Sequence, residues 1–266
     1  PGTLRVMNPV SRLARWGGNG LARFLTHPVR RYQTFAVSDE NTLRAVLRPA
    51  DVLLVEGDAR VSVAIKYLTQ STWSHACLYV GDALAGHLRW HGELVEAELA
   101  DGVIASPLSK YRYYNTRICR PVGLTDADRA RVIAHVIDAL GHQYDLRNLI
   151  DLARYLIQTP PVPSRMRRKL LDFGSGDPTR GICSTIIAQG FQAVRYPILP
   201  QARSEDVDAT LSLVPTAGYT YTPQHFSLFT PRDFDLSPYF TVVKPTIERG
   251  FDYQKFRWAA LVDGAG

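Results

Sequence analysis

The stretch GICSTIIAQGFQAV, residues 181–194, places a cysteine directly before a short apolar segment. Apolar side chains recur along this segment at near-helical spacing, at Ile186, Ile187, Phe191 and Val194. The spacing predicts a helix over residues 184–194, with Cys183 at its N-terminus. Free N–H groups and the positive end of the helix dipole favour a thiolate over a thiol at such a position. Cys183 is therefore a candidate nucleophile.

A cysteine nucleophile needs a base and a polar group that orients the base. His75 stands in WSHACLYVG, residues 73–81, where residues 76–80 have the apolar character of a buried strand before a turn. Glu96 lies in a second strand-like segment, residues 93–99, which we expect to pair beside the His75 strand. A carboxylate there has an imidazole within reach. These three residues predict a Cys–His hydrolase or acyltransferase, with the histidine preceding the cysteine in the chain.

The remaining patterns predict an α+β fold in which a small antiparallel sheet packs with helices. Short strands are expected within residues 47–57 and at residues 103–104, 117–121 and 239–243. Helical spacing occurs at residues 60–70, 125–141 and 146–157. The helix at 125–141 has the clearest signals, since Thr125 can cap it and Gly141 can end it. We expect an N-terminal helical extension over residues 1–46, a central domain over 47–200, and a Pro-rich tail over 201–266 that wraps the core.

The composition favours a globular protein with free thiols over a membrane-spanning, disulfide-rich or metal-binding one. The chain of 266 residues is 45% apolar, which is enough for a sizeable core, and no run approaches the length of a membrane span. Three cysteines, Cys77, Cys119 and Cys183, show no CxxC spacing, which favours free thiols over a disulfide scaffold or a thiolate metal site. Cys77 shares a strand face with His75 and is interpreted as a bystander. His87 and His91 lack the spacing of a metal motif and are expected to be surface residues.

Two basic segments bear on partners. Residues 8–26 resemble a broken amphipathic helix, which either makes peripheral contact with an anionic membrane or packs on its own domain. The run RMRRK, residues 165–169, is the densest positive charge and is either a phosphate contact or a solvated loop. No interleaving of aromatic and basic residues accompanies this run, so we expect no nucleic-acid partner. The formal net charge of +6 is compatible with a membrane surface or an anionic substrate.

Several short motifs occur in a fixed order along the chain: DVLLVEG (51–57), SH and YVG (74–75, 79–81), VEA (95–97), SPL (106–108), GHQYD (141–145) and CS (183–184). In this order they resemble the permuted papain-like amidases of the YaeF/YiiX type, which belong to the NlpC/P60 superfamily together with the lecithin:retinol acyltransferase-like enzymes. The resemblance covers residues 48–194 and recurs in FDLSPYF, residues 234–240. In this branch the histidine strand precedes the cysteine helix, as it does here.

The resemblance implies a circularly permuted papain-like fold for residues 47–200. It implies Cys183 as the nucleophile, His75 as the base and Glu96 as the polar third residue. Tyr144 is similar to the tyrosine of NlpC/P60 relatives that can donate a hydrogen bond to the oxyanion.

The expected reaction is hydrolysis of an amide or ester bond through an acyl-thioester on Cys183, with no metal or cofactor. The resemblance implies a cell-wall peptide or an acyl lipid as the substrate, and the basic segments favour a lipid-like or membrane-proximal one. An acyltransferase of the same fold and a catalytically inactive lipid- or peptide-binding module are the alternatives. A bacterial cytoplasmic, periplasmic or membrane-associated location is compatible with these expectations.

Overall fold

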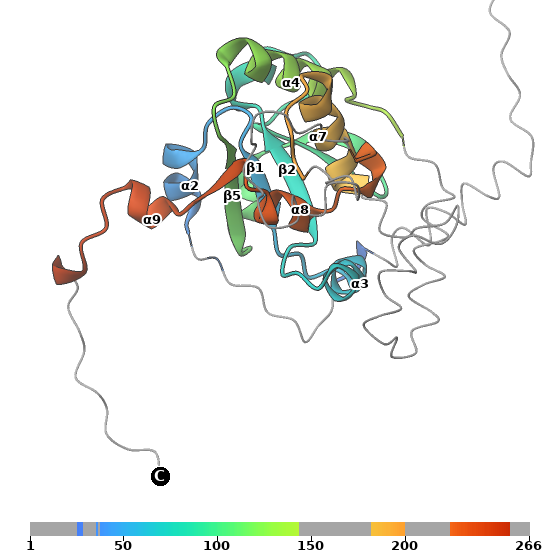
Figure 1. The fold of residues 1–266 in the computed structure, drawn as a ribbon. Helices are drawn as coiled ribbons and strands as arrows, with labels where there is room; N and C mark the ends of the chain where they lie inside the picture. Colours follow the sequence, from blue (N-terminus) through green and yellow to red (C-terminus); the bar gives the residue numbers. More distant parts are fainter. Residues whose placement is uncertain (1–25, 29–35, 37, 144–181, 200–223, 256–266) are drawn as a thin grey trace, which may run out of the picture.

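A six-stranded antiparallel sheet forms the centre of the protein (Figure 1). The computed structural model describes residues 26–28, 36, 38–143, 182–199 and 224–255. The strands lie in the order β4-β3-β2-β1-β5-β6. Their bounds are Val52–Val55 (β1), His75–Tyr79 (β2), Leu94–Glu98 (β3), Gly102–Ser106 (β4), Thr116–Pro121 (β5) and Phe240–Val243 (β6). The predicted α+β class and the small antiparallel sheet are confirmed.

Helices cover both faces of this sheet. The α-helices described are α2 (Glu40–Val46), α3 (Arg60–Thr69), α4 (Asp126–Asp138), α7 (Ile182–Ala193), α8 (Pro231–Leu236) and α9 (Pro245–Glu248). Short 3₁₀ turns are η1 (Gly81–Leu84), η2 (Leu108–Tyr111), η4 (Phe226–Leu228) and η5 (Tyr253–Lys255). The predicted helix at 125–141 is α4, and the Thr125 hydroxyl caps it by accepting a hydrogen bond from the Asp128 N–H at 3.1 Å. The predicted cysteine helix is α7, which begins two residues earlier than expected, so Cys183 lies within its first turn.

Alternating strand residues divide the core into two layers, because successive side chains of a strand point to opposite faces. Leu54, Leu78 and Val95 belong to the larger layer, which packs against α4 and α7. Leu53 and Cys77 belong to the smaller layer, which packs against α2 and η2. In Figure 1, α4 and α7 lie together on one side of the sheet, and they also contact each other. A residue's position along a strand therefore decides which helices it meets.

The C-terminal residues join this core. Strand β6 pairs with β5, with Phe240 opposite Pro121 and Val243 opposite Ile118, so the predicted strand at 239–243 is confirmed. Aromatic rings connect this segment to α7: the ring of Phe240 lies edge-on to that of Phe191, with 5.2 Å between centroids. Phe234 of α8 is fully buried in the same cluster. This cluster attaches the C-terminal segment to the helix that carries Cys183.

Other predictions fall on residues that the structure does not describe. These are the amphipathic segment before Thr26, the helix expected at 146–157 and the basic run at 165–169. Within the described ranges, no helix has both the length and the apolar character needed to cross a membrane.

Candidate active site

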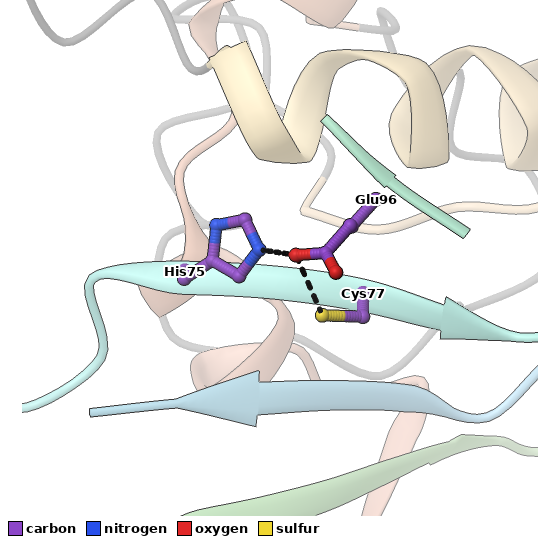
Figure 2. A group of neighbouring side chains, drawn as sticks. All are labelled: His75, Cys77 and Glu96. Atoms are coloured by element: carbon purple, nitrogen blue, oxygen red, sulfur yellow. Dashed lines mark hydrogen bonds and ion pairs between the residues drawn. The ribbon is translucent and has the colours of Figure 1, made fainter. Parts of the chain in front are cut away.

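His75 and Glu96 meet at the end of strand β2 (Figure 2). His75 is the first residue of β2, and Glu96 lies in β3 directly opposite Cys77, two residues beyond His75. The distance between His75 Nε2 and Glu96 Oε2 is 2.6 Å. The predicted pairing of the two strands is confirmed, and with it the reach between carboxylate and imidazole.

The Glu96 carboxylate is fully buried and receives several donors. Lys110 Nζ lies 2.7 Å from Oε1, and the Tyr111 hydroxyl donates to Oε2. The Cys77 thiol also approaches Oε2, with a separation of 3.8 Å (Figure 2). A buried carboxylate is costly unless it is paired and hydrogen-bonded, and here both oxygens have partners. The carboxylate is thus held in one place beside the imidazole.

Cys183 approaches the same place from α7. Its Sγ lies 4.0 Å from the carbonyl oxygen of Ser74, the residue before His75. The next residue, Ser184, anchors the start of the helix, because its hydroxyl donates to the Phe229 carbonyl at 2.6 Å. The proximity of Cys183 is one of the causes that raise the pKa of His75. The structure therefore brings together Cys183, His75 and Glu96, which lie far apart in the sequence.

The two residues that precede β2, Trp73 and Ser74, are also held in place by hydrogen bonds. The Ser74 N–H donates to the Val55 carbonyl at 3.1 Å, and the Ser74 hydroxyl accepts from the Gly57 N–H at 3.0 Å. Trp73 is buried, and its indole N–H donates to Asp235 Oδ2 at 3.1 Å. Because His75 follows directly, these contacts limit the movement of the imidazole relative to α7.

His75 and Glu96 each favour the charged form of the other. Burial alone lowers the pKa of His75, but interactions with the Cys77 and Cys183 side chains outweigh it, so this pKa lies well above its usual value. The Glu96 carboxylate against Nε2 acts in the same direction. Burial raises the pKa of Glu96, yet the hydrogen bond to His75 and the charges of His75 and Lys110 overcome it and place this pKa far below its usual range. Glu96 is therefore an anion at neutral pH.

Of the two thiols beside the imidazole, Cys183 is the more exposed. Cys77 has no exposed surface, and burial together with the Glu96 charge raises its pKa, so Cys77 stays a neutral thiol. Cys183 retains 5% exposure and lies in the first turn of α7. That Cys77 is a bystander stays a prediction.

His75, Cys77 and Glu96 also offer ligand atoms of the kinds that bind metals, all within 4.8 Å of one another. The surroundings do not fit an ion, because the Lys110 ammonium already lies at 2.7 Å from Glu96 Oε1 and repels a second cation. The Tyr111 hydroxyl and the imidazole occupy Oε2. The donor set is thus better matched to an oriented imidazole than to a metal.

The other residues singled out in the sequence are elsewhere. His87 and His91 are exposed, as expected, and His87 Nδ1 accepts from the backbone N–H groups of Arg89 and Trp90 within its own loop. Tyr144, expected to serve the oxyanion, lies outside the described residues. Lys110 and Tyr111 were missed by sequence reasoning. Their one signal is that they follow the SPL motif, residues 106–108, after Ser109.

Comparison with known proteins does not assign this site. No protein-family model matches the chain, and no curated protein sequence matches it significantly.

Proposed function

We propose that this protein is a cysteine hydrolase with a permuted papain-like fold, which cleaves an amide or ester bond through an acyl-thioester on Cys183. The observation that carries the proposal is the 2.6 Å contact between His75 Nε2 and the fully buried Glu96, made where Cys183 approaches β2 from the first turn of α7. A nucleophile, a base and an orienting group in this relation are the arrangement that thiol acyl transfer needs.

The contact with Glu96 assigns the two ring nitrogens different roles. An ionised carboxylate can only accept hydrogen bonds. His75 Nε2 therefore carries a hydrogen and donates it in the hydrogen bond to Glu96. The neutral tautomer then leaves Nδ1 free to take the thiol proton of Cys183. The resulting thiolate attacks the carbonyl carbon of the substrate, and the leaving group departs with the proton from Nδ1. A water molecule, deprotonated by the same nitrogen, then hydrolyses the thioester and releases the acid.

The order of the elements supports the same assignment. The histidine strand comes before the cysteine helix, as in the permuted amidases that the sequence resembles. In our proposal the substrate is a cell-wall peptide or an acyl lipid, and the N-terminal basic segment gives the enzyme peripheral contact with membranes. Transfer to an acceptor other than water uses the same thioester, so an acyltransferase is distinguished by its product.

Alkylation and turnover test the proposal together. Iodoacetamide should modify Cys183 near neutral pH, and Cys77 and Cys119 should react slowly because both are fully buried. Incubation with acyl lipids or peptidoglycan fragments should leave an acyl adduct on Cys183 that mass spectrometry detects. Cys183→Ala and His75→Ala should each abolish turnover, and the double variant should be little worse than either, because nucleophile and base act as a unit. A folded protein with an inert Cys183 would instead indicate a binding module.

A further inference from the structure

Turn η2 contributes two side chains to the site that the proposed reaction does not use. Lys110 and Tyr111 follow each other at the end of this turn, and each holds one oxygen of Glu96. Tyr111 is buried, while Lys110 is partly open to solvent. The turn itself is anchored, because Leu108 is fully buried and its N–H donates to Glu93 Oε2 at 3.0 Å.

We propose that Lys110 and Tyr111 are positioning residues, which act through Glu96 to set the orientation and the protonation of the His75–Cys183 pair. This inference rests on the proposed function of that pair. Tyr111 fixes the oxygen that faces the imidazole, since its hydroxyl and His75 Nε2 share Oε2. Lys110 balances the negative charge through the other oxygen, Oε1.

The charges around the imidazole come from several elements. Strand β2 supplies the Cys77 thiol and α7 supplies Cys183, both adjacent to His75. Strand β3 supplies Glu96, and η2 supplies Lys110 and Tyr111. Beyond them, Glu98 pairs with Lys110, and Tyr114 packs edge-on against Tyr111 while its hydroxyl donates to Asp58 at 3.4 Å.

Lys110 is the cation of this group that remains charged in every catalytic state. Its pKa is raised, because the Glu96 and Glu98 carboxylates outweigh the effect of burial. The Tyr111 pKa is raised mainly by burial, so its hydroxyl remains a donor across the working range of pH. Neither side chain needs to exchange a proton to act.

Loss of the Lys110 charge should shift the titration of the His75–Cys183 pair in a predictable direction. The two protons of the His75–Cys183 pair are released in steps that belong to the pair. Removing a nearby positive charge makes each proton harder to release, so both steps move to higher pH. Removing the negative charge of Glu98, which faces Lys110 and not the imidazole, acts in the opposite direction and less strongly, since Glu98 is further away and partly exposed.

The test is the pH profile of Cys183 alkylation by iodoacetamide, measured by mass spectrometry of the intact full chain, which requires no substrate. Lys110→Met should move the midpoint of the profile towards alkaline pH by about one pH unit, the size expected for one partly exposed charge at this range. Lys110→Arg should restore the profile. Glu98→Gln should leave the midpoint unchanged or move it slightly towards acid pH.

Tyr111→Phe tests whether Tyr111 orients the Glu96 carboxylate. It also keeps the inference testable if Lys110→Met does not fold. The variant keeps the ring packing and removes one donor, so alkylation at the wild-type optimum should slow about tenfold with a smaller shift of the midpoint. A folded Lys110→Met with the wild-type profile, or a Tyr111→Phe with the wild-type rate, would overturn the inference. If Cys183 in the wild-type protein is unreactive at neutral pH, the proposed function itself fails, which is a distinct result.

Discussion

Glu96 is the residue on which the site depends, because it is buried without exposure yet remains charged. The chain supplies donors from two elements to hold it, His75 from β2 and the Lys110–Tyr111 pair from η2. A surface ion pair is worth little, but removal of one partner from a buried network leaves an uncompensated charge. The effect of a substitution at Glu96 should therefore appear in both activity and stability.

Glu96→Gln should lower kcat about 10- to 1,000-fold while Cys183→Ala abolishes turnover. The amide keeps the size of the side chain but no longer stabilises the imidazolium that forms during attack, so the imidazole loses part of its orientation and basicity. Steady-state rates and the extent of alkylation give the measurement. A Glu96→Gln enzyme with the wild-type rate would remove Glu96 from the mechanism.

Cys77→Ala should leave turnover within about threefold of wild type and reduce stability by about 1 kcal/mol, the cost of a small buried void. The expectation follows from the position of Cys77, which is fully buried against the Glu96 carboxylate and held as a neutral thiol. Thermal unfolding and rate measurements check it. Complete loss of activity in a folded Cys77→Ala protein would transfer the role of nucleophile to Cys77.

Cys183, His75 and Glu96 could be singled out from the sequence as candidate site residues, since each has a local signal: a cysteine at a helix start, and a histidine and a glutamate within apolar strands. Lys110 and Tyr111 could not. They lie on a 3₁₀ turn after Pro107, where no periodicity indicates which way a side chain points. Their contact with Glu96 depends on the pairing of β3 with β4 and on the fold of the turn, which are tertiary features.

At the scale of elements, the strand positions and the pairing of β2 with β3 could be predicted from the sequence, but the other strand neighbours could not. Residues 52–55 are an aliphatic run, and they form β1. The same run does not indicate that β1 lies between β2 and β5, or that Val55 is opposite both His75 and Thr116. A strand with both faces buried has no alternation to fix its register, so these pairings come from the packing of whole layers.

The attachment of β6 gives a prediction at this scale. Phe240→Ala should destabilise the protein by about 3–5 kcal/mol, because the ring is almost fully buried and contacts Phe191, Phe234 and Tyr196. Since Phe191 lies in α7, the loss should also slow alkylation of Cys183. Chemical denaturation measures the first effect and mass spectrometry the second. Ile247→Ala on the exposed side of α9 is the control, and its stability should change by less than about 0.5 kcal/mol.

At the scale of the whole molecule, the two core layers lie on opposite faces of one sheet. The candidate site lies at the start of β2, where residues from both sides of the sheet come together. Glu96 lies opposite Cys77, whose layer packs against η2, and it contacts Lys110 and Tyr111 of that turn, whereas the apolar side chains of α7 pack in the other layer. His75 can meet both because it is the first residue of β2. Stability of the layers and geometry of the site are therefore linked.

This linkage predicts how stability depends on pH. The folded-state pKa of Glu96 lies below its unfolded value of about 4.3, so its contribution is fully present above that pH and is lost as the pH falls towards the folded-state pKa. The folded-state pKa of His75 is raised, so its contribution is present below about 6.5 and is lost as the pH rises through the folded-state value.

The free energy of unfolding in urea should accordingly be highest between about pH 4.5 and 6.5 as far as these two groups determine it. Glu96→Gln should be less stable than wild type by about 3 kcal/mol at pH 6, because Lys110 and His75 then lose their buried partner. The difference should shrink as the pH falls from 5 to 3, since the unfolded wild-type chain then binds a proton at Glu96 while the folded protein does not, which lowers the free energy of unfolding of the wild type only. A difference that stays constant over that range would show that the variant acts through packing and not through the charge of the carboxylate.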